Sequence, residues 1–208
     1  MVEMLADKAL EDFRVYLNSK NASDLTIGAY QTDLIQFFEF ASAELGKDYT
    51  QVNIQDIDKY IIRSYLGHLT KKSLSRKTIA RKLAALRSFF KFLCREGVLV
   101  KNPVQKFTTP KVSRSLPTYL FEEHINKLLE APDLNSKNGL RDQVILELLY
   151  GSGLRVSELV GLNKSDVDLL SGLIRVRGKG KKERIVPLTV KAQSVLSLYL
   201  SKRDDNEE

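Results

Sequence analysis

Residues 75–97 form the segment that most constrains how this chain of 208 residues folds. Ser75 stands where a helix N-cap is expected, and Gly97 stands where the helix would stop. Between them, apolar side chains recur at helical spacing and fall within roughly 80° of arc on a helical projection. They are Ile79, Leu83, Leu86, Phe90 and Leu93. A helix with such a stripe predicts a partner surface that buries it.

Three further apolar sets with the same spacing precede this helix. Ser23 or Thr26 is the candidate cap of the second set, and the third set follows Asn53. The sets are Leu5, Ala9, Phe13, Tyr16 and Leu17; Ile27, Tyr30, Leu34, Phe38, Ala41 and Leu45; and Ile54, Ile57, Ile61, Tyr65 and Leu69. Four amphipathic helices over residues 1–100 predict a compact helical bundle.

The opposite side of the fourth helix is basic. Six cations fall within an arc of roughly 140°, interleaved with Ala80, Ala84 and Ser88. They are Arg76, Lys77, Arg81, Arg87, Lys91 and Arg95. Small residues between long cations allow a helix to enter the major groove while the cations reach phosphates and base edges. An ordinary solvated face is the alternative, but such a face usually carries Glu as well, and this one has no acid before Glu96.

The net charge of +7 is concentrated in two regions. From Lys71 to Arg114, thirteen Lys or Arg accompany one acid, and from Gly172 to Lys191, seven accompany one acid. The rest of the chain is net acidic. This segregation indicates a polyanionic partner, and we expect double-stranded DNA. No run of eighteen apolar residues and no signal-peptide layout is present, so we expect a cytoplasmic protein without a membrane partner.

Helical periodicity ends after Gly97, and residues 101–117 are polar, basic and punctuated by prolines. We expect them to form a linker that could follow a phosphate backbone, or a plain tether.

Residues 118–208 combine helical and strand patterns. We expect helices at Phe121–Glu130, Arg141–Tyr150 and Val190–Leu200, and a short one carrying Arg155 after the break at Gly151-Ser152-Gly153. Strands are expected at Leu173–Val176 and Glu183–Pro187, joined by a turn at 178–180. The predicted fold is therefore mainly α with a small β-hairpin, in two domains, the second of them α+β.

Two cations of the second domain suit phosphodiester chemistry. Arg155, at a helix start, could present its planar fork to a phosphate, and Lys179, on a glycine-flanked hairpin, could protonate a leaving oxygen. Each also has a simpler interpretation. Arg155 could pair with Glu158 on its own helix, and Lys179 could be a solvated turn residue.

Three motifs taken together resemble the Xer branch of the tyrosine recombinase (phage integrase) family. They are Leu149 to Leu159, Gly178 to Leu188, and the helix from Ser75 to Leu93. The resemblance implies a four-helix, SAM-like core-binding domain and a recombinase catalytic domain that clamp a duplex from opposite sides. It also implies that Arg155 is a catalytic arginine, Lys179 the general acid, and Glu158 a supporting residue that orients the arginine helix. Lys181 and Lys182 would join the basic helix in contacting DNA.

The family pattern continues with a His-x-x-Arg box, a further histidine or tryptophan, and a nucleophilic tyrosine. Within the 208 residues the histidines are His68 and His124, which both precede Arg155, and the last tyrosine, Tyr199, belongs to an amphipathic helix. We therefore expect a C-terminally truncated recombinase whose catalytic domain is incomplete and inactive. It would bind DNA, remain a monomer without DNA, and need no metal or cofactor, whereas the full-length family works with partner subunits.

Two alternatives remain open at this point. One is a natural short relative that occupies recombination sites without cutting them. The other is a regulator of the helix-turn-helix type, although neither a ligand segment nor a dimerisation segment is evident.

Overall fold

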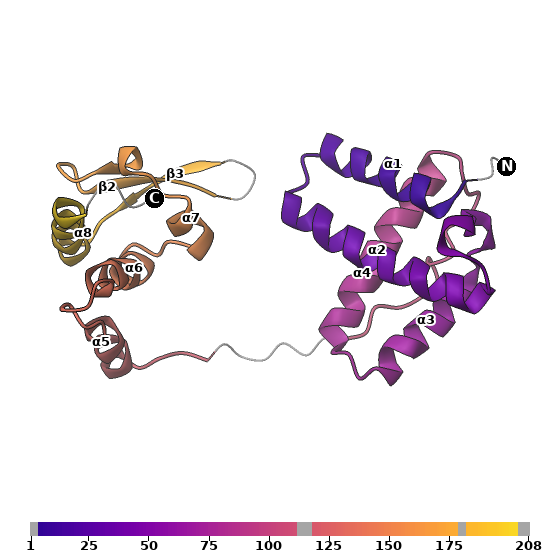
Figure 1. Ribbon diagram of the computed structural model, residues 1–208, viewed down its shortest axis with the longest axis horizontal. Coiled ribbons are helices and arrows are strands. Elements are labelled where there is room, and N and C mark those ends of the chain that lie inside the picture. The colour runs from indigo at the N-terminus through magenta and orange to yellow at the C-terminus, as the bar shows by residue number, and fades with distance from the viewer. Residues whose placement is uncertain (1–3, 112–117, 179–181, 204–208) are drawn as a thin grey trace. The chain divides into compact units, whose positions relative to one another are not determined.

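The computed structural model describes residues 4–111, 118–178 and 182–203. The chain divides into two compact units, Met1–Ser115 and Leu116–Glu208, each with its own hydrophobic core (Figure 1).

The first unit is the expected four-helix bundle. Its α-helices are α1 (Ala6–Ser19), α2 (Asp24–Leu45), α3 (Lys59–Lys71) and α4 (Arg76–Arg95), and α4 lies against α2 (Figure 1). All five apolar residues predicted for α4 are buried. Aromatic rings fill the centre of the core in edge-to-face pairs, such as Phe38 with Phe89 at 5.7 Å between centroids.

Helix boundaries follow the predicted caps at α2 and α4. The hydroxyl of Ser23 accepts from the Thr26 N–H, and the hydroxyl of Ser75 accepts from the Thr78 N–H. Gly97 adopts φ +74° just beyond α4, a conformation that costs glycine little. Both ends of α4 are therefore fixed by local chemistry.

The prediction that the third helix begins directly after Asn53 is wrong. Asn53 and Asp56 form a reciprocal capping box around a single 3₁₀ turn, η2 (Ile54–Asp56). The carboxylate of Asp58 then accepts from the N–H groups of Tyr60 and Ile61, so α3 begins at Lys59. A second 3₁₀ turn, η1 (Tyr49–Gln51), precedes η2.

The first part of the segment expected as a linker packs on the first unit. Val104 is fully buried in the core of that unit, and Phe107 packs against the same core. Residues as far as Phe107 therefore contribute to the folded bundle.

The second unit places helices against one face of a small sheet. Its helices are α5 (Glu122–Glu130), α6 (Gly139–Gly151), α7 (Val156–Val160) and α8 (Val190–Lys202), with one 3₁₀ turn, η3 (Lys164–Asp166). The strands are β1 (Val167–Asp168), β2 (Leu173–Arg177) and β3 (Glu183–Pro187). They form an antiparallel sheet in the order β1-β2-β3, and the two-residue β1 was not predicted.

Alternation along β2 turns Ile174 and Val176 inward, and Val186 joins them from β3. These side chains form one cluster with Val144 and Leu148 of α6, and with Ala192 and Leu196 of α8. Figure 1 shows α6 and α8 beneath the sheet. Across the described residues, no helix is long and apolar enough to cross a membrane.

Candidate functional site

A sharp turn between α6 and α7 positions Arg155. Helix α6 ends at Gly151, and Gly153 turns the chain with φ +60°, where an L side chain would be strained. Leu154 is buried, which anchors the turn to the core. Arg155 then occupies the N-cap position of α7 in an extended conformation. The break at Gly151-Ser152-Gly153 therefore places one arginine at the start of a helix.

Arg155 is held by Glu158 on the same helix. The Arg155 backbone N–H donates to Glu158 Oε2 at 2.8 Å, and its Nη1 donates to Glu158 Oε1 at 2.7 Å. The Arg155 side chain nevertheless remains 70% exposed. Because a guanidinium carries five N–H donors, the group can be fixed by Glu158 and still bind an external anion.

The carboxylate of Glu158 is a shared acceptor at the centre of this site. Its side chain is only 1% exposed, and Arg184 of β3 donates from Nη2 to Oε2 at 2.8 Å and from Nε to Oε1 at 3.3 Å. The pKa of Glu158 is lowered to about 2. The largest cause is the hydrogen bond from Arg184, and the next is the hydrogen bond from the Arg155 backbone N–H. Glu158 is therefore charged and connects the start of α7 to strand β3.

The base of the β2–β3 hairpin closes against the same carboxylate. The Gly178 N–H donates to the carbonyl oxygen of Lys182 at 2.7 Å, and a Cβ on Gly178 would lie 3.3 Å from Glu158 Oε1. Lys182 is exposed, whereas Lys179 and Lys181 lie outside the described residues. The structure thus brings Arg155, Glu158 and the hairpin base together.

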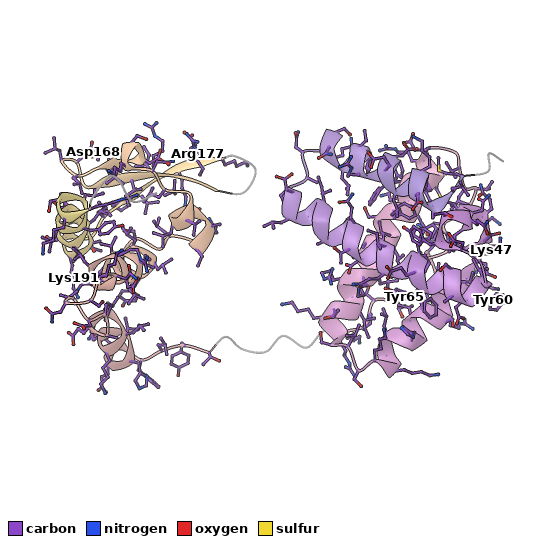
Figure 2. The ribbon with its side chains drawn as sticks, in the orientation of Figure 1. Lys47, Tyr60, Tyr65, Asp168, Arg177 and Lys191 are labelled. Atoms are coloured by element: carbon purple, nitrogen blue, oxygen red, sulfur yellow. The ribbon has the colours of Figure 1, made fainter. Side chains whose placement is uncertain are left out.

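A second buried carboxylate joins α6 to α8. Lys191 Nζ lies 2.8 Å from Oε1 of Glu147, whose side chain is buried, and Figure 2 shows Lys191 on this unit. The close contact with the Glu147 carboxylate raises the pKa of Lys191. This pair fixes α8 against the helix that leads into the Arg155 turn, and no sequence pattern predicts it.

The cations on the predicted basic face of α4 differ in the groups that they contact. Arg76, Lys77 and Lys91 are exposed. Arg81 is ion-paired through Nη1 with Asp33 of α2, and its side chain is 48% exposed. These four are available to an external polyanion.

Arg87 contacts its own chain. Its Nη1 donates to the hydroxyl of Thr109 at 2.5 Å, and its Nη2 donates to the carbonyl oxygen of Phe107. Arg87 therefore ties the segment after the bundle to α4.

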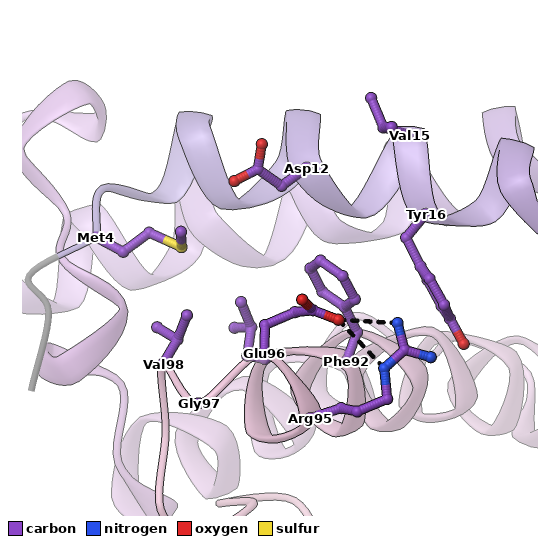
Figure 3. Close-up of a pocket in the computed structure, with 10 residues that line it drawn as sticks. Met4, Asp12, Val15, Tyr16, Phe92, Arg95, Glu96, Gly97 and Val98 are labelled. Atoms are coloured by element: carbon purple, nitrogen blue, oxygen red, sulfur yellow. Dashed lines mark hydrogen bonds and ion pairs between the residues drawn. The ribbon is translucent and has the colours of Figure 1, made fainter.

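Arg95 lies at the edge of a surface pocket of about 520 Å³ between α1 and the end of α4 (Figure 3). Its guanidinium carbon sits 4.3 Å from the ring centroid of Tyr16, and its Nη2 lies 2.8 Å from Glu96 Oε1. Tyr16 in turn stacks on Phe92 at 5.0 Å between centroids. Arg95 thus contacts both α1 and the residue that follows it, and its side chain stays 52% exposed.

The two histidines differ in environment. His124 is exposed on α5, whereas His68 is half-buried and its ring centroid lies 4.9 Å from that of Phe40. Tyr199 packs against the core of the second unit. Among the described residues, no group of three or more His, Cys, Asp or Glu could hold a metal ion.

Sequence reasoning missed Asp33, Lys82 and Arg184. A signal existed for Asp33, because it stands three residues after Tyr30 and four before Phe37, on the apolar stripe of its helix. Arg184 stood inside the hairpin motif, but its partner could be known only from the fold.

Two family models match the chain. The model for the N-terminal SAM-like domain of phage integrases matches residues 10–97, and the model for the phage integrase family itself matches residues 118–208. The chain belongs to the phage integrase family. The resemblance noted in the sequence and the expected fold class are both confirmed.

Curated relatives in this family are similar over most of the chain. Tyrosine recombinase XerC of Pelotomaculum thermopropionicum is 44% identical over 194 residues, which cover 93% of this chain and 63% of the relative. Tyrosine recombinase XerD of Staphylococcus epidermidis is 42% identical over 193 residues, covering 89% of this chain and 62% of the relative. This phage integrase family chain therefore spans somewhat less than two thirds of their length.

Solved structures show the same fold. A post-cleavage complex of the XerH site-specific recombinase bound to palindromic difH substrate has a TM-score of 0.65 and 26% identity. That match covers 95% of this chain and 58% of XerH. The Tn1549 transposon integrase in complex with transposon right end DNA has a TM-score of 0.71 at 17% identity, covering 99% of this chain and 67% of the integrase. The second likeness concerns the fold alone.

Proposed function

We propose that this phage integrase family protein is a site-specific DNA recombinase of the tyrosine recombinase type. It binds double-stranded DNA, and recombinases of this type break and rejoin strands through a phosphotyrosine intermediate. The observation that carries this proposal is the Glu158 site, in which a buried carboxylate holds Arg155 while the Arg155 side chain stays 70% exposed. The similarity to XerC, XerD and XerH supports the same proposal.

In the proposed mechanism Arg155 binds the non-bridging oxygens of the phosphate that is cut. A planar, permanently charged fork suits the charge that develops there, and Glu158 fixes its direction in advance. Lys179 donates a proton to the departing 5′ oxygen, as the general acid. The covalent protein–DNA link conserves the energy of the broken bond, so neither a metal nor a high-energy cofactor enters the scheme.

DNA affinity comes from two sets of cations in this proposal. Arg76, Lys77, Arg81 and Lys91 on α4 contact the duplex, and Lys181 and Lys182 of the hairpin add phosphate contacts. Arg87 and Arg95 were predicted to contact DNA as well. Their bonds to Phe107, Thr109, Tyr16 and Glu96 support a role in shaping the unit that carries the contacts.

We further propose that residues 1–208 by themselves bind DNA without cutting it. The histidines in this stretch both precede Arg155, and Tyr199 is partly buried against the core of the second unit. Incubation with a nicked suicide substrate should give no protein–DNA band that survives SDS. A surviving band that disappears on mutation of one of the eight tyrosines would contradict this part of the proposal.

The phosphate contact of Arg155 can be tested on the 208-residue chain. A duplex enriched from a random-sequence library would be resynthesised with one neutral methylphosphonate at a time. At one position the replacement should weaken DNA binding by the unmodified protein but leave the affinity of Arg155→Ala unchanged. The reason is that the phosphate charge and the Arg155 guanidinium form one contact, which Arg155→Ala has already lost. Arg141→Ala, which removes an arginine paired with exposed Asp142, is the control and should retain sensitivity at that phosphate. Equal sensitivity of all three proteins at every phosphate would refute the role of Arg155.

A further inference from the structure

Below Arg81, a buried carboxylate binds two cations. Asp33 of α2 is 2% exposed, and its Oδ1 accepts from Lys82 Nζ at 2.9 Å while its Oδ2 accepts from Arg81 Nη1. Lys82 is itself buried and also donates to Gln36 Oε1 at 2.5 Å. The cluster therefore joins α2 and α4 through charged groups rather than apolar contacts alone.

The charges of this cluster do not cancel. Lys82 alone neutralises Asp33, and both are withdrawn from solvent, so a second cation is not needed to compensate the buried carboxylate. Arg81 adds a further positive charge while its side chain stays 48% exposed. The surplus charge is thus presented at the surface at one fixed point.

Arg81 lies on an exposed part of α4, where it can contact an external molecule. Lys77 lies one turn before it and Ala84 one turn after it, and all three are exposed. A small residue beside Arg81 leaves room for a duplex backbone to approach the guanidinium. Arg87 differs, because both of its Nη groups donate to the segment after the bundle.

We propose that Asp33 is a positioning residue that holds Arg81 in the geometry in which it binds a DNA phosphate. The inference rests on the proposed function, and it concerns how affinity is produced. An unrestrained arginine loses side-chain conformational entropy when it binds phosphate. An arginine that is already bonded to Asp33 has lost that entropy on folding. The contact with Asp33 uses one of five N–H donors, which leaves the outer edge of the fork for phosphate.

The test removes the support without changing the net charge. Asp33→Leu combined with Lys82→Met deletes one negative and one positive charge, removes the acceptor that holds Arg81, and leaves no buried ion unpaired. Duplex affinity would be measured by fluorescence anisotropy at several salt concentrations, with circular dichroism melting as the check on folding. The double variant should bind about threefold to tenfold more weakly, the scale for ordering one side chain.

The same double substitution in an Arg81→Ala background gives the decisive comparison. There it should change affinity no further, because Asp33 acts through Arg81. Arg81→Ala should also reduce the slope of log affinity against log salt by about 0.9, as expected for one phosphate contact. A loss of affinity of the same size with and without Arg81 would overturn the positioning role.

These measurements distinguish an error in the role of Asp33 from an error in the proposed function. If Arg81→Ala leaves affinity and salt slope unchanged while Arg76→Ala with Lys77→Ala weakens binding, the inference is wrong and DNA binding stands. If the unmodified chain binds no duplex, both are wrong.

A measurement without variants guards against misfolding of the double mutant. In nitrogen-15 NMR of the free protein, the guanidinium N–H groups of Arg81 should rotate slowly, and those of exposed Arg76 rapidly. Rapid rotation of Arg81 would overturn the inference.

Discussion

Val104 tests whether the segment after α4 belongs to the folded bundle. Its side chain is fully buried in the first unit, so Val104→Ala removes two methyl groups from a packed core. At about 0.8 kcal/mol of transfer free energy for each group, plus a cavity term, the unfolding free energy of this unit should fall by about 2 kcal/mol. Val100→Ala is a matched control, because Val100 is 80% exposed and neither valine lies in a helix or strand.

Hydrogen exchange provides the assay, since the protein has no tryptophan to report unfolding. The amides of Phe89 and Phe90, in the middle of α4, should exchange through global unfolding of the unit. In Val104→Ala their exchange should be faster by about thirtyfold, and in Val100→Ala it should change by less than about threefold. Equal, small effects of the two substitutions would refute the packing of residues up to Phe107 and move the start of the linker back towards Gly97.

Three further predictions concern the Glu158 site. The pKa of Glu158 is lowered to about 2 from an ordinary value of 4.5, so the stability that this carboxylate contributes is complete above pH 4.5 and is lost as the pH falls towards 2. Melting temperatures of the natural chain and Glu158→Gln should therefore converge over that range, and a constant gap would contradict it. Gly178→Ala should weaken DNA binding because its Cβ would crowd Glu158 Oε1 at 3.3 Å, whereas Gly67→Ala, in open space, should not; equal affinities would argue against the contact. In a chimera that joins residues 1–208 to the C-terminal part of XerC, a substrate with sulfur at the bridging 5′ position should rescue cleavage by Lys179→Ala but not by Arg155→Ala, and rescue of both or of neither would remove the general-acid role.

Local signals predicted much of the fold. Ser75 and Gly97 bracket α4 because capping and a positive φ are decided by residues adjacent in sequence. The start of α3 was mispredicted because Ile54 and Ile57 fit helical spacing, while the pairing of Asn53 with Asp56 closes the turn early. Strand β1 has two residues, too few for an alternation to be recognised.

The candidate site was predictable only in part. Helical projection placed Arg81, Arg87 and Arg95 on one face, and nothing in that projection separates them. Their partners lie on α2, on the segment after the bundle, and on α1, so the distinction depends on tertiary packing. The proximity of Arg155 to Glu158 followed from their spacing on one helix, whereas Arg184 reaches Glu158 from 26 residues away in the sequence.

The shared carboxylate of Glu158 has a consequence for how variants of this protein combine. Arg155 and Arg184 both donate to it, so loss of Glu158 removes the shared acceptor of two guanidinium groups and the negative charge between them. A substitution at Glu158 is therefore expected to be tolerated better in a background where Arg184 is already uncharged. The order in which changes arise at these positions would then decide which of them survive, and a scan of single substitutions would understate the paths open to the site.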